Sequence, residues 1–126
     1  MKIRGAIRNS TPLVGASIRA GTLRLGGPAE THFVVDTGFT GSIAIPKEVA
    51  RRLRLTFVGI QSLTLATGVE VEVPLYVGNV RVGTRVVETS FIVGDALIGM
   101  ELLEEIASGV RFDLEGRNLS IELKPA

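Results

Sequence analysis

A single aspartate stands at the end of an apolar run and is followed by small and hydroxylated residues. Residues 33–42 read FVVDTGFTGS, with Asp36 directly after three apolar residues. Burying an unpaired carboxylate is costly, so Asp36 is either held by hydrogen bonds for a structural reason or placed there for chemistry. The structural alternative is an Asx turn, in which the carboxylate accepts backbone N–H groups at the start of the loop.

Several kinds of chemistry use an aspartate after a strand, and most of them need neighbours that this chain lacks. A phosphoaspartate enzyme of the haloacid dehalogenase type carries a second acid two residues later, where this chain has Gly38, and needs alternating strands and helices. A phosphate-binding loop needs a longer glycine spacing and a lysine. A calcium loop needs several oxygen ligands close together, and the nearest acids are Glu30 and Glu48.

A pair of aspartates that share one proton fits the stretch better. Two carboxylates about 3 Å apart cannot both ionise, so the pair can act as acid and base on a water molecule that attacks an amide. The chain carries one Asp-Thr-Gly, so the second aspartate would come from a twofold-related copy in an isologous homodimer. Gly38 allows the two loops to approach closely, and the Thr37 hydroxyl can form a hydrogen bond across the axis.

Composition limits the kinds of partner that we expect. The 126 residues fit one domain, 1–126, which can bury its own core. The net charge of +1 gives no field for attracting nucleic acid or an anionic membrane, and no run approaches the roughly 18 apolar residues of a membrane span. No cysteine is present, and the lone His32 is typical of a sheet surface. We therefore expect a cytoplasmic protein without a signal peptide, metal or cofactor, and with neither nucleic-acid nor membrane partners.

Short runs rich in Val, Ile, Leu and Thr, separated by Gly, Asn or Pro, predict a mostly β protein. Two helical segments interrupt them, PKEVARRLRL from Pro46 and GMELLEEIASG, which is expected to end at Gly109. Turn signals at Gly78-Asn79 and at residues 116–118 favour a compact, closed barrel of hairpins.

The chain contains an internal repeat. Residues 29–35 read AETHFVV and residues 87–93 read VETSFIV, and each segment follows a hairpin and precedes a short helix. Strands share a small alphabet, but agreement in element order as well as in letters favours duplication. The halves differ after the strand, because Asp36-Thr37-Gly38 follows the first copy and GDALIG, at 94–99, follows the second.

Together these features resemble the retropepsin-type aspartic proteases, close to their single-domain bacterial and archaeal relatives. The family's apolar strand ending in Asp-Thr-Gly is matched by residues 33–38, and the strand that follows is matched by residues 42–45. Its later apolar-apolar-Gly segment, which leads into a helix, is matched by Leu97, Ile98 and Gly99 ahead of MELL. The family has a flap hairpin between these segments, and LTLATGVEV at 63–71 stands in the matching place.

The resemblance implies an all-β, acid-protease-like closed barrel with a flap hairpin, two short helices and an internal pseudo-twofold repeat. It implies a homodimeric aspartic endopeptidase, in which Asp36 activates the water, Thr37 and Gly38 brace the loops, and the Gly38 carbonyl binds substrate backbone. The alternative is a non-catalytic, dimeric peptide-binding or assembly module on the same fold.

The resemblance also implies which other residues meet a peptide or protein substrate. The flap tip would contact it from above, and the apolar-apolar-Gly segment would support the active-site loop. These residues are Ala66, Thr67 and Gly68 at the tip, and Leu97, Ile98 and Gly99 in the supporting loop.

Three positions depart from the family pattern. Phe39 stands where retroviral members usually have Ala or Ser, so a bulky residue at the mouth of the site would narrow the substrate cleft or pack on the partner subunit. Met100 and Gly41-Ser42 stand where those enzymes place an arginine and its acidic partner, so apolar packing must replace an ionic brace. Gly68 is the single glycine left at the flap tip. Each change is expected to lower activity or restrict substrates.

Overall fold

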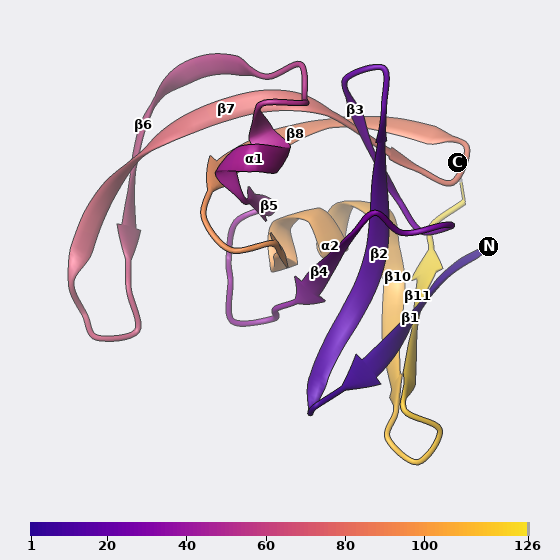
Figure 1. Cartoon of the computed structure of the whole chain (residues 1–126). Coiled ribbons are helices and arrows are strands. Elements are labelled where there is room, and N and C mark those ends of the chain that lie inside the picture. Colours follow the sequence, from indigo (N-terminus) through magenta and orange to yellow (C-terminus); the bar gives the residue numbers. More distant parts are fainter. Residues whose placement is uncertain (126) are drawn as a thin grey trace.

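Strands dominate the computed structural model, which describes residues 1–125 (Figure 1). Two short helices accompany the strands, and this confirms the mostly β architecture predicted from the sequence. The helices are α1 Lys47–Ala50 and α2 Met100–Ile106. The strands are β1 Lys2–Arg8, β2 Thr11–Arg19, β3 Thr22–Leu25, β4 Thr31–Val35, β5 Ile43–Ile45, β6 Thr56–Thr64, β7 Glu70–Val82, β8 Arg85–Val93, β9 Leu97–Ile98, β10 Ala107–Asp113 and β11 Asn118–Leu123.

All eleven strands are hydrogen-bonded into one sheet, in the order β10-β11-β1-β2-β3-β7-β8-β5-β9-β4, with β6 paired to β7. Strand β4 also pairs with β2, so the pairings run from β2 through β3, β7, β8, β5, β9 and β4 back to β2. Parallel pairs join β3 to β7, β4 to β9 and β5 to β8. Pairing alone does not define the shape of a barrel, so the closed barrel stays a prediction.

The core is one apolar cluster that reaches from Ile3 in β1 to Ile121 in β11. Alternation along strands such as β3 and β11 directs every second side chain inward, and α2 adds Leu102 and Ile106. Phe33 of β4 and Phe91 of β8 are both fully buried. Burial of a side chain of this size contributes about 1.5–3 kcal/mol, so the core fixes β4 and β8 firmly.

One predicted turn is wrong. Gly78 and Asn79 lie inside β7, where Gly78 is the register partner of Thr89 in β8. A Cβ at Gly78 would lie 2.6 Å from Cδ2 of Leu55, so the glycine permits close packing rather than a turn. The β7–β8 hairpin turns further on, at Gly83, whose φ is +63°. The turn signal at 116–118 is confirmed, because it joins β10 to β11.

Both helices are shorter than the sequence predicts. Helix α1 begins after Pro46 and ends at Ala50, because the chain then bends and the Arg54 N–H donates to the Gly21 carbonyl at 2.9 Å. Helix α2 ends at Ile106 rather than at Gly109, since Ala107 is already extended and β10 pairs with β11. Tertiary pairing overrides helix propensity at both ends. No helix within residues 1–125 has the length and apolar character needed to cross a membrane.

Strands β6 and β7 form a long hairpin that extends to one side of the molecule (Figure 1). Strand β6 is hydrogen-bonded to β7 alone. A bulge between Phe57 and Gly59 increases the local twist. The rings of Phe57 and Tyr76 pack edge to face across the hairpin, with centroids 5.8 Å apart. The hairpin therefore has a braced base and a tip that lies away from the core.

Candidate active site

Asp36 lies immediately beyond the end of β4. Its N–H donates to the Ile98 carbonyl at 2.9 Å and so continues the parallel pairing of β4 with β9. Val35, the residue before it, is buried, whereas Asp36 itself is half-buried. A strand anchored in the core therefore delivers one carboxylate to the point where the chain leaves the sheet.

An Asx turn orients this carboxylate. Oδ1 of Asp36 accepts the Gly38 N–H at 2.9 Å, and the Phe39 N–H donates to the Asp36 carbonyl at 3.1 Å. The turn that the sequence offers as a structural alternative is thus present. It occupies one carboxylate oxygen only, because no hydrogen bond or ion pair within residues 1–125 reaches Oδ2. The carboxylate is held by one oxygen and can interact with a further group through the other.

Backbone hydrogen bonds tie the loop after Asp36 to the start of α2. The first N–H groups of a helix have no acceptor within the helix, and here the loop carbonyls accept them. The three bonds run from the Gly99 N–H to the Ser42 carbonyl at 2.9 Å, from the Met100 N–H to the Phe39 carbonyl at 2.8 Å, and from the Glu101 N–H to the Gly41 carbonyl at 3.2 Å. These bonds hold the loop at Gly41, Ser42 and Met100, the positions where retroviral members of the family would place an acid and an arginine.

Gly99 allows the loop and the helix to approach each other closely. A Cβ at this buried position would lie 2.1 Å from the Gly41 carbonyl oxygen and 2.7 Å from the Phe39 carbonyl oxygen. The Phe39 ring covers both glycines, since a Cβ at Gly41 would lie 2.6 Å from its Cζ. Half-buried Phe39 therefore packs on its own loop. Contact between Phe39 and a substrate or a partner subunit stays a prediction.

A buried hydroxyl pair supports the same loop from the other side. Ser42 precedes β5 and is 1% exposed, and Thr89 of β8 is 8% exposed. Their hydroxyl groups are hydrogen-bonded to each other. Sequence reasoning did not identify this pair as supporting the site. A signal was present, because each hydroxyl residue lies next to or within an apolar strand segment, but the sequence does not reveal that the two strands pair.

The other predicted site residues fall into two groups. Thr37 and Gly38 are exposed on the Asp36 loop, next to the supporting segment 97–99. The predicted flap tip lies in the exposed turn between β6 and β7, closed by the Leu65 N–H donating to the Val69 carbonyl at 2.8 Å. That tip consists of Ala66, Thr67 and Gly68. Among residues 1–125, no hydrogen bond connects it to the Asp36 loop.

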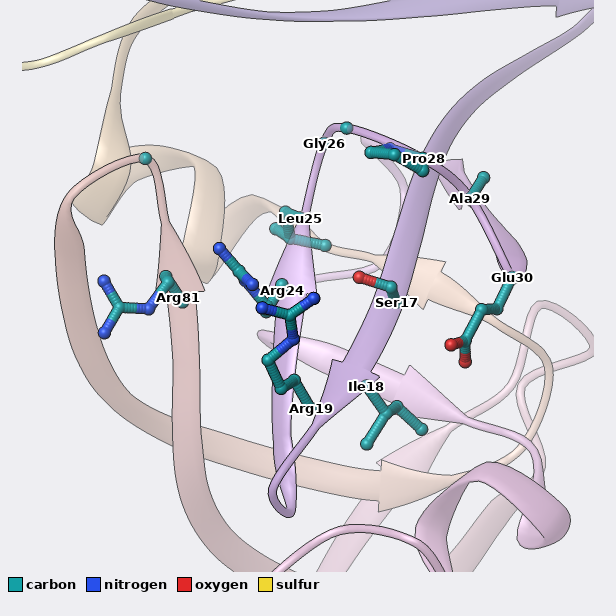
Figure 2. A pocket seen from close by; sticks show the side chains of 12 residues that line it. Ser17, Ile18, Arg19, Arg24, Leu25, Gly26, Pro28, Ala29, Glu30 and Arg81 are labelled. Carbon is teal, nitrogen blue, oxygen red and sulfur yellow. The ribbon is translucent and has the colours of Figure 1, made fainter.

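The hollow shown in Figure 2 is separate from Asp36, and its lining includes residues of β2, β3 and β7 and of the loop 26–30. Residues 1–125 contain no group of three or more His, Cys, Asp and Glu side chains that could hold a metal ion. His32 is exposed on β4, as expected of a residue on the sheet surface.

Comparison with known proteins shows the family to which the chain belongs. A family model described as an aspartyl protease matches residues 21–105, more than half of the chain. The chain belongs to the aspartyl protease family. The match extends from the β2–β3 turn into α2, and so includes the Asp36 loop and the β6–β7 hairpin. It confirms the family resemblance and supports a hydrolase of the aspartic protease type that acts on peptides. Neither the curated proteins nor the solved structures gave a significant match.

Proposed function

We propose that this aspartyl protease is an endopeptidase that works as a homodimer, with Asp36 of both subunits in one shared site. The observation that carries the proposal is the state of Asp36. The carboxylate is half-buried, is oriented through Oδ1 by the Gly38 N–H, and leaves Oδ2 without a protein partner among residues 1–125. It also lies within the segment that the family model matches.

The strand pairings support the need for a second chain. Strand β4 pairs in parallel with β9, and strand β8 pairs in parallel with β5. Beyond β4 the Asp36 N–H donates to the Ile98 carbonyl, and beyond β8 the Gly94 N–H donates to the Ile45 carbonyl at 2.8 Å. The two halves thus use the same arrangement, as a duplicated fold would. Glycine occupies the place in the second half that Asp36 occupies in the first, so one chain supplies a single carboxylate.

The proposed reaction uses two carboxylates that share one proton and hold a water molecule between them. The ionised carboxylate takes a proton from the water as its oxygen attacks the amide carbon. The protonated carboxylate gives its proton to the carbonyl oxygen, which forms a tetrahedral diol. As the diol collapses, its carbon–nitrogen bond breaks, and the carboxyl group that took the proton from water gives it to the leaving nitrogen. The other carboxylate accepts a proton from a diol hydroxyl, so an acid and an amine are released and the pair again shares one proton. The Asx turn at Gly38 keeps Asp36 in a fixed orientation throughout.

The β6–β7 hairpin is proposed as the flap over the substrate. Its tip is formed by small and polar residues with few contacts to lose on opening. Several large apolar side chains are exposed along it, which is unfavourable unless a peptide or a second subunit covers them. These are Phe57, Val58, Ile60, Leu65 and Val69.

A non-catalytic, dimeric peptide-binding module is the second candidate. The hydrogen bond from Gly38 favours it, because that bond alone gives Asp36 a structural purpose. The two candidates differ in turnover and in whether a transition-state analogue of aspartic proteases binds more tightly than a peptide.

The decisive experiment is digestion of a mixed library of unstructured peptides by the wild type and by Asp36→Asn. Asparagine retains the oxygen that accepts the Gly38 N–H, so the loop is expected to stay folded while cleavage is lost. Wild-type and variant chains are then mixed in equal amounts and allowed to exchange subunits. If each site needs two aspartates, about a quarter of the activity remains after exchange, whereas independent sites would leave about half of it. No cleavage by a folded dimer, combined with binding of peptides, would support the second candidate.

A further inference from the structure

We propose that the face formed by β2, β3 and β7 binds an oxyanion of the phosphate class. Three arginines, Arg19, Arg24 and Arg81, line the hollow shown in Figure 2, and we call them the arginine face. The proposal concerns a site separate from Asp36 and does not depend on the protease activity.

Strand register brings the three arginines to the same side of the sheet. Arg24 of β3 is the direct partner of Arg81 in β7, and on its other side it is the direct partner of Ser17 in β2. Partners in register point to the same face of a sheet, and so do residues two apart on one strand. Arg19 therefore shares the face through Ser17. The opposite face of these strands carries buried core residues such as Leu23 and Val80.

No carboxylate neutralises the arginine face. Within residues 1–125 none of its guanidinium groups has an ion pair within 4.0 Å. Glu30 lines the same hollow, but its carboxylate is paired with Arg52 at 3.0 Å and lies across β2 from the three arginines (Figure 2). Glu88 shares the outer face of the sheet as the register partner of Asn79, and it does not line the hollow.

The arginine face concentrates positive charge. The formal net charge of the whole protein is +1, yet three positive side chains line this one hollow, and Arg24 and Arg81 are half-buried. Like charges directly opposite each other on neighbouring strands destabilise a sheet. An anion between them removes that repulsion and accepts hydrogen bonds from the planar guanidinium groups, which match the oxygens of a phosphate in pairs.

The hollow offers room and further polar groups for such an anion. Its volume is about 430 Å³, and Ser17 and the Gly26-Gly27 bend line it. The Ser17 hydroxyl has no hydrogen-bond partner among the described residues. Both glycines of the bend have positive φ, +86° and +72°, which favours residues without a side chain. The Gly26 N–H donates to the Gly15 carbonyl at 2.8 Å, and a Cβ at Gly27 would meet nothing within 4 Å, so the backbone at Gly27 is uncovered. A small phosphorylated molecule therefore fits the lining better than an apolar ligand does.

The hollow and the candidate active site lie at opposite ends of β4. Glu30, at the hollow, precedes the strand and Asp36 follows it, a separation on the order of 20 Å for extended chain. Substitutions on the arginine face can therefore be tested without altering Asp36.

The test is isothermal titration of the full chain with inorganic phosphate at constant ionic strength, with sodium chloride as the reference titration. The wild type and Asp36→Asn are expected to bind one phosphate per chain with saturation and equal affinity. Arg24→Gln and Arg81→Gln each lose a charged donor, which is expected to weaken phosphate binding about tenfold. The matched control is Arg111→Gln on exposed β10, which is expected to bind like the wild type.

Thermal unfolding in phosphate-free buffer gives a second readout. Arg24→Gln and Arg81→Gln are expected to raise the midpoint by removing like-charge repulsion. Added phosphate is expected to raise the wild-type midpoint, and to raise theirs only at about tenfold higher concentration. A titration that does not saturate, or that matches chloride, would overturn the proposal. So would an equal loss of affinity in Arg111→Gln, because that result would indicate general attraction to positive charge.

Discussion

Replacing Gly99 with alanine tests whether the close approach of loop and helix holds the Asp36 loop in place. The added methyl carbon would lie 2.1 Å from the Gly41 carbonyl oxygen, 2.7 Å from the Phe39 carbonyl oxygen and 2.6 Å from the Phe39 ring. Two of these three obstacles are backbone atoms, which cannot rotate away as a side chain can. The loop must therefore move away from α2.

The expected cost follows from those contacts. Overpacking of this kind costs about 1–3 kcal/mol. The movement also weakens the backbone bonds between the loop and the first turn of α2, each contributing about 1 kcal/mol. The free energy of unfolding should fall by about 2–5 kcal/mol, which corresponds to a midpoint lower by about 8–20 °C for a chain of this size.

Thermal unfolding followed by circular dichroism measures this effect, with Gly94→Ala as the matched control. A Cβ at Gly94 meets nothing within 4 Å, so its midpoint should stay close to that of the wild type. Adding Phe39→Ala to Gly99→Ala removes the ring but leaves both carbonyl groups, and so should not restore stability. The reasoning is refuted if Gly99→Ala is as stable as Gly94→Ala, or if Phe39→Ala restores it fully.

Three further substitutions test neighbouring contacts by urea denaturation. Ser42→Ala leaves the buried Thr89 hydroxyl without its hydrogen-bond partner and should lower the free energy of unfolding by about 1–3 kcal/mol. Ser42→Ala combined with Thr89→Val should cost less than the two single changes added together. Strict additivity would contradict an interaction between the two hydroxyl groups. Gly78→Ala places a methyl 2.6 Å from Leu55 Cδ2 and 3.1 Å from the Arg54 carbonyl oxygen and should cost about 1–3 kcal/mol. Leu55 packs against the core, so Leu55→Ala has a cost of its own, and the double variant should cost less than the two single changes added together; strict additivity would mean that backbone, not the side chain, is the obstacle. Asp36→Asn should unfold within about 0.5 kcal/mol of the wild type, and a larger loss would show that the charge itself holds the loop.

The sequence was informative where the evidence lies close together along the chain. Alternating apolar residues predicted the strands, and Asp36, Thr37 and Gly38 are consecutive, so the turn they form could be anticipated from their chemistry. The helix ends could not, because β10 pairs with β11 and takes Ala107 out of the helix. The helix propensity of a segment does not include the free energy gained when β10 pairs with β11.

The features that the sequence could not predict depend on contacts between segments that are far apart along the chain. Alternation of apolar and polar residues shows which side chains of a strand share a face, but it does not show which strand is its neighbour in the sheet. The pattern therefore could not predict the parallel pairing of β5 with β8. Nor could it predict the hydrogen bond between Ser42 and Thr89, which are 47 residues apart. The arginine face depends in the same way on Arg24 and Arg81 lying opposite each other in β3 and β7. A motif therefore points to the proposed catalytic carboxylate, whereas the groups that hold its loop and the arginines that line the hollow depend on strand order.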